Sequence, residues 1–221
     1  MKTEACIFDL DGVIVDTAKY HFMAWKRLAG QLGIEFTEED NERLKGVSRM
    51  ASLEIILELG GVELSRSEKE SFATLKNGWY KEYINKMEPG ELLPGSLDFI
   101  KKVKAAGLPV AIGSASKNTP LILERVGISN LFDAVADGNV VKKAKPDPEV
   151  FLKAAEMMNT PPGNCVVFED AVAGIQAARN AGMMCIGIGS PDVLGEADLV
   201  VGGLYEMSLG KLKKLEGKLG I

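Results

Sequence analysis

The chain has 221 residues, of which 46% are hydrophobic and 26% are charged. That composition is typical of a globular protein, and the length suffices for one medium domain or for a domain with a small insertion. The formal net charge of −5 argues against a surface for nucleic acid or for an anionic membrane, because such surfaces carry clustered lysine and arginine. An anionic small substrate is not excluded, since a pocket can be basic inside an acidic protein.

We expect neither a signal peptide nor a membrane span. The apolar stretch at the start of MKTEACIFDLDG runs directly into acidic residues, and no run approaches the ~18–20 apolar residues that cross a bilayer. The cysteines Cys6, Cys165 and Cys185 lie in apolar runs, their number is odd, and no CxxC occurs. These features predict reduced, buried cysteines in a cytoplasmic protein, and neither disulfides nor metal ligands.

The first predicted element is a short apolar strand from Ala5 to Asp9. Residues 15 to 88, which follow it, contain no good strand and several helical patterns. Ala24, Leu28 and Leu32 recur every four residues, which indicates a helix.

Two more helices are predicted in this region. A helix with its end is indicated by Leu53, Ile56, Leu57 and Gly60. For the next helix, Ser67 and Glu70 are predicted to form a capping box. The apolar face of that helix is predicted to comprise Phe72, Leu75, Trp79 and Tyr83.

From about residue 93 onward, strand signals alternate with helix signals. The strand-like runs are Leu108 to Ser114, Ala134 to Asp137, Cys165 to Glu169, Cys185 to Ile188 and Leu199 to Val201. Helices between them are indicated by Leu97, Ile100 and Val103 ahead of Gly107, by Thr119 and Pro120 with Gly127 as the stop, and by Asp147 with Pro148.

Apolar runs without alternation suit strands that are covered on both faces, and a repeat of strand and helix predicts a parallel sheet with right-handed crossovers. The predicted fold class is therefore α/β, a doubly wound parallel sheet with an inserted all-helical cap. The predicted domains are a core of residues 1–14 and 89–221 and a cap of residues 15–88.

Two acids follow the first strand. Asp9 comes directly after the apolar run, at the edge of an open α/β sheet where ligands bind, and Gly12 allows a sharp turn just after Asp11. Two carboxylates about 4 Å apart repel by about 4 kcal/mol at an effective dielectric constant of about 20. Such a pair is tolerated when a cation lies between them or when one carboxyl stays protonated as a general acid.

Three further features occur at or just after strand ends. Ser114 can hold a phosphoryl oxygen or cap a helix, Lys145 can neutralise charge or be a solvated side chain, and Glu169–Asp170 can complete an oxygen-ligand site for Mg²⁺. Together with DxDG, these features resemble the four motifs of the haloacid dehalogenase superfamily. The resemblance covers the whole chain, including the cap inserted after the first motif.

The resemblance implies a chemistry for each motif. Asp9 is the expected nucleophile that forms an aspartyl-phosphate, and Asp11 the expected general acid and base. One Mg²⁺ per chain is the expected cofactor, held by Asp9, the carbonyl of Asp11 and Asp170, with Glu169 close by. Residues expected to neutralise the phosphoryl oxygens are Ser114, Ala115 and Lys145.

Further segments resemble the β-phosphoglucomutase family within that superfamily. They are His21-Phe22-x-Ala24-Trp25, Lys45-Gly46-Val47-Ser48-Arg49, Lys76 and Ser114-Ala115-Ser116-Lys117-Asn118. The resemblance implies substrate contacts from His21, Trp25, Lys45, Gly46, Val47, Ser48, Arg49, Ser52, Lys76, Ser116, Lys117 and Asn118. It also implies a hinge at Asp16 and Thr17, a cap network around His21 that couples closure to Asp11, and a distal phosphate held by Arg49, Lys117 and Asn118.

The expected reaction interconverts β-D-glucose 1-phosphate and D-glucose 6-phosphate through the 1,6-bisphosphate. A phosphatase acting on a small sugar phosphate remains an alternative, because the core motifs are the same for both. Asp11 speaks against the related phosphonoacetaldehyde hydrolases, and the presence of Asp9, Asp11 and Asp170 speaks against a non-catalytic binding protein. The expected partners are small sugar phosphates, with no nucleic acid and no membrane, for a protein expected to be a monomer.

Overall fold

The computed structural model describes residues 2–44 and 47–218, with side-chain burial up to residue 215. The chain forms two compact units, Met1–Asp16 with Glu88–Ile221, called the core unit here, and Thr17–Met87, called the cap unit. The predicted boundaries, after residues 14 and 88, lie within two residues of these; that the units are independent domains stays a prediction.

The core unit contains a six-stranded sheet in the order β3-β2-β1-β4-β5-β6, and every neighbouring pair is parallel. The strands are β1 Ala5–Phe8, β2 Val110–Gly113, β3 Ala134–Ala136, β4 Cys165–Glu169, β5 Met184–Ile188 and β6 Leu199–Val201. All six were predicted, each within two residues of its observed bounds. The order places β1 in the interior of the sheet, between β2 and β4.

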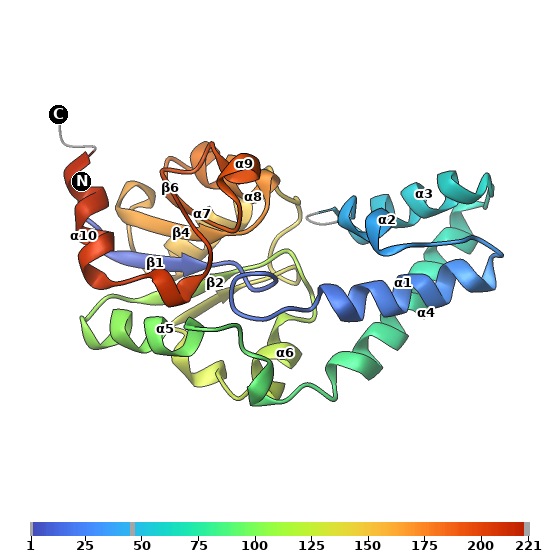
Figure 1. Ribbon diagram of the computed structural model, residues 1–221, viewed down its shortest axis with the longest axis horizontal. Helices are drawn as coiled ribbons and strands as arrows, with labels where there is room; N and C mark the ends of the chain where they lie inside the picture. The colour runs from blue at the N-terminus through green and yellow to red at the C-terminus, as the bar shows by residue number, and fades with distance from the viewer. Residues whose placement is uncertain (1, 45–46, 219–221) are drawn as a thin grey trace. The chain divides into compact units, whose positions relative to one another are not determined.

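Helices cover both faces of this sheet (Figure 1). The α-helices of the core unit are α5 Ser96–Ala105, α6 Thr119–Arg125, α7 Glu149–Met157, α8 Val172–Asn180, α9 Pro191–Leu194 and α10 Leu209–Lys218. Short 3-10 helices span Pro89–Glu91, Ser129–Leu131, Pro162–Asn164 and Leu204–Glu206. The predicted doubly wound α/β fold is confirmed, and α8, α9 and α10 add to the helices that the sequence indicated.

Alternating side chains of the central strands supply both hydrophobic layers. Ile7 and Val167 point to the layer that contains Phe151 of α7 and Ile175 of α8. The residues after them point the other way: the rings of Phe8 and Phe168 stack with centroids 4.6 Å apart, and both meet Phe99 of α5 edge-on. Burial on both faces explains why these strands read as continuous apolar runs.

The cap unit is helical: α1 Ala18–Gln31, α2 Glu38–Glu42, α3 Arg49–Gly60 and α4 Arg66–Ile84. Helix α4 packs against both α1 and α3. Helix α3 ends at Gly60, as predicted, and the next residue, Gly61, takes a left-handed conformation with φ 60°.

Two predictions about α4 were wrong. The capping box is formed by Ser65 and Glu68, each of which lies two positions before its predicted counterpart, Ser67 or Glu70. The buried face is also different, because Leu75 is 42% exposed whereas the neighbouring Lys76 is 2% exposed. The buried residues of α4 are Ala73, Lys76, Trp79, Tyr80 and Ile84.

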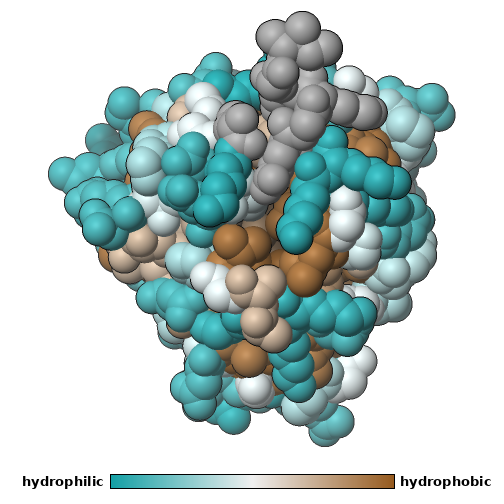
Figure 2. All heavy atoms as spheres, turned by 90° about the vertical axis from the view of Figure 1, so that its left-hand side faces the viewer, coloured by the Kyte–Doolittle hydropathy of each residue, from teal (hydrophilic) through white to brown (hydrophobic). Residues whose placement is uncertain are grey.

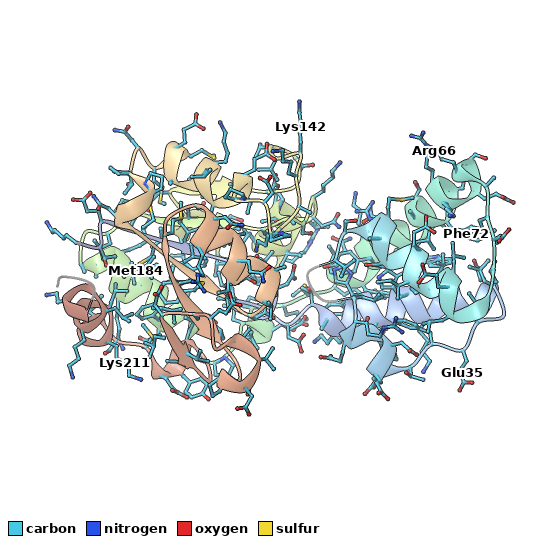
Figure 3. The ribbon with its side chains drawn as sticks, turned by 90° about the horizontal axis from the view of Figure 1, so that it is seen from above. Glu35, Arg66, Phe72, Lys142, Met184 and Lys211 are labelled. Atoms are coloured by element: carbon cyan, nitrogen blue, oxygen red, sulfur yellow. The ribbon has the colours of Figure 1, made fainter. Side chains whose placement is uncertain are left out.

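The cysteines and the surface fit the composition. Cys6, Cys165 and Cys185 are buried free thiols, as predicted. Among the described residues no helix has both the length and the hydrophobicity needed to cross a bilayer. Figure 2 faces the end of the core unit where α10 lies, and there hydrophilic side chains surround a smaller hydrophobic area. Arg66 and Lys142 extend away from their units, whereas Met184, 3% exposed, lies inside (Figure 3).

Candidate active site

The carboxyl ends of the central strands bring the motif residues to one edge of the sheet. Asp9 directly follows β1, and its N–H donates to the Phe168 carbonyl of β4 at 2.9 Å, so the ladder continues past the strand end. Glu169 is the last residue of β4. Because parallel strands end at a common edge, residues 160 positions apart in the chain become neighbours.

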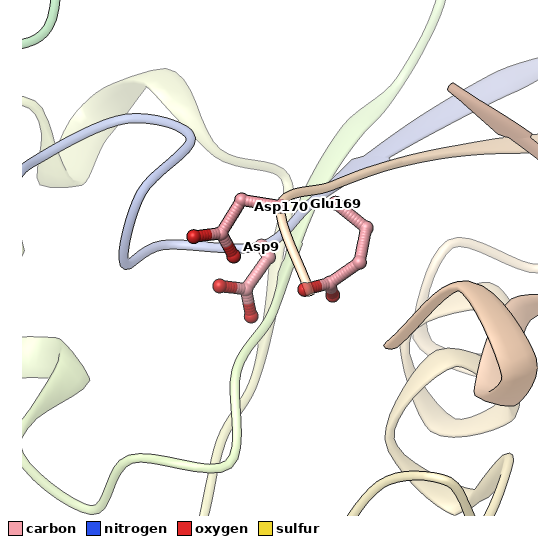
Figure 4. A group of neighbouring side chains, drawn as sticks. All are labelled: Asp9, Glu169 and Asp170. Carbon is pink, nitrogen blue, oxygen red and sulfur yellow. The ribbon is translucent and has the colours of Figure 1, made fainter. Parts of the chain in front are cut away.

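Three carboxylates gather at this edge. One oxygen each from Asp9, Glu169 and Asp170 lies within 4.8 Å of the others, and Figure 4 shows the three side chains directed toward a common point. Asp9 and Glu169 are buried, and Asp170 is half-buried. A cluster of carboxylate oxygens of this kind could hold a metal ion.

Lys145 supplies positive charge to the cluster. Its Nζ donates to Oδ1 of Asp9 at 2.5 Å and to Oε2 of Glu169 at 2.8 Å, and lies 4.8 Å from the ring centroid of Phe151. Burial alone would lower the pKa of Lys145, but the two carboxylates outweigh it and hold that pKa above its ordinary value. Lys145 is therefore a fixed cation beside Asp9.

The carboxyl groups still outnumber the ammonium. Burial raises the pKa of Asp9 well above its ordinary value; Lys145 opposes this shift, while Glu169, Asp11 and Asp170 add to it. Burial, then Glu169 and Asp11, raise the pKa of Asp170 to about 8. A divalent cation among these oxygens would offset the excess negative charge, so the donor set fits such an ion.

Two glycines make room for these acids. A Cβ on Gly12 would lie 1.9 Å from Oδ2 of Asp170, and Gly12 has φ 77°, which side chains disfavour. A Cβ on Gly174, in the first turn of α8, would lie 2.1 Å from Oε2 of Glu169. Gly12 belongs to the predicted motif, whereas nothing in the sequence pointed to Gly174 or to Phe151.

The 114–118 loop, residues Ser114 to Asn118, follows β2. Ser114 is 2% exposed, its N–H donates to the Ala136 carbonyl of β3 at 3.0 Å, and its Oγ accepts from the Ser116 N–H at 3.2 Å. Oγ of Ser116 in turn accepts from the Asn118 N–H at 3.2 Å. The loop is thus built by its own serines, with Ala115 and Lys117 exposed and Asn118 buried.

His21 and Lys76 lie together within the cap unit. Nζ of Lys76 lies 2.8 Å from Nδ1 of His21, and it also lies 4.3 Å and 4.9 Å from the ring centroids of Trp25 and Tyr80. Burial, followed by the charges of Lys76 and Arg49, holds the pKa of His21 well below its ordinary value. An ammonium can only donate, so Nδ1 accepts and the ring proton of a neutral His21 is on Nε2.

The other predicted substrate residues of the cap unit lie on or before α1 and α3. Trp25 and Ser52 are buried, Val47 and Arg49 are half-buried, and exposed Ser48 caps α3 by accepting from the Ala51 N–H at 3.3 Å. Lys45 and Gly46 lie outside the described residues. That these side chains contact substrate stays a prediction.

The predicted hinge coincides with a boundary in the structure. The two units divide between Asp16 and Thr17. Thr17 is fully buried, and its carbonyl accepts from the N–H groups of Tyr20 and His21 at the start of α1. Asp11, further back, pairs with Val15 in an isolated bridge, which closes the turn between β1 and this boundary.

Comparisons with known proteins agree with this architecture. Residues 3–182 match the model of the haloacid dehalogenase-like hydrolase family. The chain is 44% identical to the β-phosphoglucomutase of Bacillus subtilis (strain 168) over 93% of its own length and 92% of that protein. It is 34% identical to a phosphorylated carbohydrates phosphatase of Thermotoga maritima, over 81% of this chain and 82% of that protein.

The fold has a close match among solved structures. The crystal structure of β-phosphoglucomutase from Clostridium difficile superposes with a TM-score of 0.92 at 41% identity, covering 98% of both chains. A likeness of this extent includes the cap as well as the core. The chain belongs to the haloacid dehalogenase-like hydrolase family.

Proposed function

We propose that the protein is a phosphomutase that interconverts β-D-glucose 1-phosphate and D-glucose 6-phosphate. The observation that carries the proposal is the 44% identity to the Bacillus subtilis β-phosphoglucomutase across nearly the whole of both chains. The cluster of Asp9, Lys145, Glu169 and Asp170 supports it from the side of chemistry, because these groups suit phosphoryl transfer to a carboxylate.

Asp9 is the proposed nucleophile. A carboxylate oxygen of Asp9 forms a bond to phosphorus while the bond from phosphorus to the leaving oxygen breaks, which gives an aspartyl-phosphate. Asp11 donates a proton to the leaving oxygen and, in the second half-reaction, accepts one from the sugar hydroxyl that attacks the phosphoryl group. The bisphosphate that results returns its other phosphoryl group to Asp9, so phosphate is moved and none is lost.

The neighbours of Asp9 make this attack feasible. A carboxylate that approaches a phosphate dianion meets like-charge repulsion, so the site must supply positive charge. Lys145 is held beside Oδ1 of Asp9 and is proposed, with Ser114 and the backbone of Ala115, to contact the transferring phosphoryl oxygens. One Mg²⁺, when bound, supplies the further charge, and Asp9, Asp170, the Asp11 carbonyl and Glu169 are the proposed residues that hold it.

The proposed substrate contacts follow from the same likeness. Arg49, Lys117 and Asn118 are proposed to hold the phosphate that is not transferred, and Ser116 is a further proposed substrate contact. The proposed sugar contacts are His21, Trp25, Lys45, Gly46, Val47, Ser48, Ser52 and Lys76, and the proposed hinge is Asp16 and Thr17. A monomer in the cytoplasm, as the sequence suggests, completes the proposal.

The test is a coupled assay of glucose 6-phosphate formation. Purified protein with Mg²⁺ and a trace of β-glucose 1,6-bisphosphate is given β-glucose 1-phosphate or, in parallel, the α anomer. We expect the wild type to form glucose 6-phosphate from the β anomer alone. Asp9→Asn should form neither glucose 6-phosphate nor a phosphoenzyme, while its circular dichroism spectrum should match that of the wild type. Release of free phosphate without glucose 6-phosphate would instead identify a phosphatase.

A further inference from the structure

The 114–118 loop has to present donors to an anion, yet it also carries backbone carbonyl oxygens. A carbonyl oxygen that faces a phosphate repels it, so carbonyls next to the proposed phosphate-holding residues need partners elsewhere. In the structure the carbonyl of Ser116 accepts from the N–H of Gly138 at 3.4 Å and from Oγ1 of Thr119 at 2.8 Å. The carbonyl of Lys117 accepts from Nδ2 of Asn139 at 3.1 Å.

The side chain of Asn139 is itself held in place by an acid. Asp137, 4% exposed, follows β3, and its Oδ1 accepts from the Asn139 N–H at 2.9 Å. Its Oδ2 accepts from Nδ2 of Asn139 at 2.8 Å. Since both neighbours of Nδ2 are acceptors, the amide must present its NH₂ group there, and its orientation is determined.

Gly138 brings the two segments into contact. A Cβ at this position would lie 2.3 Å from the carbonyl oxygen of Ala115 and 3.0 Å from the N–H nitrogen of Lys117. Both are backbone atoms, which cannot rotate away as the end of a side chain can. Any residue other than glycine would therefore displace the 114–118 loop or residues 137–139.

From these contacts we propose that Asp137, Gly138 and Asn139 position the 114–118 loop for binding of the phosphate that is not transferred. They are positioning residues: Gly138 sets the distance between the segments, and Asn139 turns the Lys117 carbonyl toward itself. The inference rests on the proposed function, in which Lys117 and Asn118 of this loop hold that phosphate. It assigns a role to residues outside the four motifs.

The test separates binding of the sugar phosphate from chemistry at Asp9. Acetyl phosphate transfers its phosphoryl group to Asp9 with release of acetate and has no second phosphate, so it reports on the core alone. For Asn139→Ala we expect the KM for β-glucose 1-phosphate to rise about fivefold, the equivalent of one hydrogen bond. The rate of Asp9 phosphorylation by acetyl phosphate should stay within about twofold of the wild type.

Two further variants test the cause. Asn139→Asp keeps the shape but places an oxygen against the carbonyl of Lys117, so its KM should rise at least as much as that of Asn139→Ala. Gly138→Ala should raise KM further, because it moves backbone. A wild-type KM in Asn139→Asp, or an equal loss of acetyl phosphate reactivity in Asn139→Ala, would overturn the proposal.

Matched controls lie elsewhere in the core unit. Gly163→Ala repeats the glycine change where a Cβ meets nothing within 4 Å. Asn164→Ala removes an amide that donates to Oε2 of Glu4 at 2.9 Å. Both should keep the wild-type KM. If the wild type only releases phosphate from the sugar phosphate, the proposed function fails, but the same KM ratios, measured from phosphate release, still decide this inference.

Discussion

A single residue, Lys145, forms ion pairs with two buried acids. Its Nζ contacts Asp9 and Glu169, and its side chain is 7% exposed. In Lys145→Met both carboxylates would lose their cation, so we expect phosphorylation of Asp9 by acetyl phosphate to slow by at least about 10²-fold. Removing one partner of a buried pair is costly, so without metal the free energy of unfolding at pH 8 should fall by about 3 kcal/mol.

The control for Lys145 is Lys143→Met. Nζ of Lys143 pairs with Oδ2 of Asp147 at 3.1 Å, but its side chain is 70% exposed. Exposed ion pairs contribute little to stability, so the free energy of unfolding in urea should match that of the wild type to within about 0.5 kcal/mol. The rate of Asp9 phosphorylation should also match the wild-type rate. Equal effects of the two substitutions would show that Lys145 acts as an ordinary surface charge.

His21 allows a prediction about pH at the same scale. Its pKa is depressed in the folded chain by burial, Lys76 and Arg49, whereas the unfolded chain has the ordinary value of about 6.5. Below that pH the unfolded state binds a proton that the folded state refuses, so the free energy of unfolding falls as pH falls. The stabilising contribution of neutral His21 is complete above about pH 7 and is lost toward the folded pKa.

We therefore expect the wild type to lose stability relative to His21→Gln between about pH 6.5 and 5, with a slope of at most about 1.4 kcal/mol per pH unit. Because the chain has one histidine, its NMR signals can be assigned without ambiguity in untagged protein. The ring should titrate well below about pH 6.5 and carry its proton on Nε2. Parallel stability curves together with an ordinary titration would contradict this account.

At the scale of the element, α4 shows which of two similar signals governs a helix start. Ser65 and Ser67 are each followed three residues later by a glutamate. Only Ser65 has the extended cap conformation, with Glu68 accepting from its N–H at 2.8 Å. Ser65→Ala should therefore destabilise the protein by about 1 kcal/mol in urea unfolding.

Ser67→Ala serves as the comparison, because Ser67 lies inside the first turn of the helix. Within the described part of the chain, the hydrogen-bond partner of its Oγ is Oγ of Ser65, at 3.2 Å. Its cost should be smaller, within about 0.5 kcal/mol. The reverse order of the two effects would place the helix start two residues later.

The same helix explains a limit of prediction from sequence. Hydrophobic spacing favoured a face with Phe72, Leu75, Trp79 and Tyr83, and hydropathy counts a lysine as polar. The structure buries Lys76 because its ammonium meets His21 and the rings of Trp25 and Tyr80. The face is therefore rotated by about one residue, a shift that depends on His21 and Trp25 of α1, which the local sequence of α4 cannot reveal.

For the whole molecule, the six strands were predictable because each is a buried apolar run. Of the core helices, α5, α6 and α7 were predictable from the residues that start or stop them, whereas α8, α9 and α10 were not indicated. The order β3-β2-β1-β4-β5-β6 was not, since pairing partners are distant in the chain. That order places β1, and Asp9 at its end, between β2 and β4, and thereby explains why Asp9 meets Glu169 and Asp170 from a distant part of the chain. The role of Asn139 could not be predicted for the same reason, because its partner, the backbone carbonyl of Lys117, is 22 residues away in the chain.

The charge of the assembled cluster leads to a prediction about metal removal. Three buried or half-buried acids share one lysine, and the pKa of Asp170 is raised to about 8. Mg²⁺ should bind the folded chain and not the unfolded one. At a Mg²⁺ concentration of about 100 times the Kd, this binding stabilises the folded state by about 2.7 kcal/mol and raises Tm by about 5–10 °C. The rise should be smaller at pH 6 than at pH 8, because protons compete for the same oxygens.

The experiment compares melting in EDTA with melting in Mg²⁺ at matched ionic strength. Asp170→Asn removes one acid of the cluster and should abolish most of the Mg²⁺-dependent rise, while its metal-free Tm should equal or exceed that of the wild type, because repulsion within the cluster is reduced. Asp192→Asn, a change of the same kind on the exposed surface of α9, should leave the rise intact. A rise that persists in Asp170→Asn would mean that the ion binds elsewhere, and the assignment of this cluster to Mg²⁺ would fail.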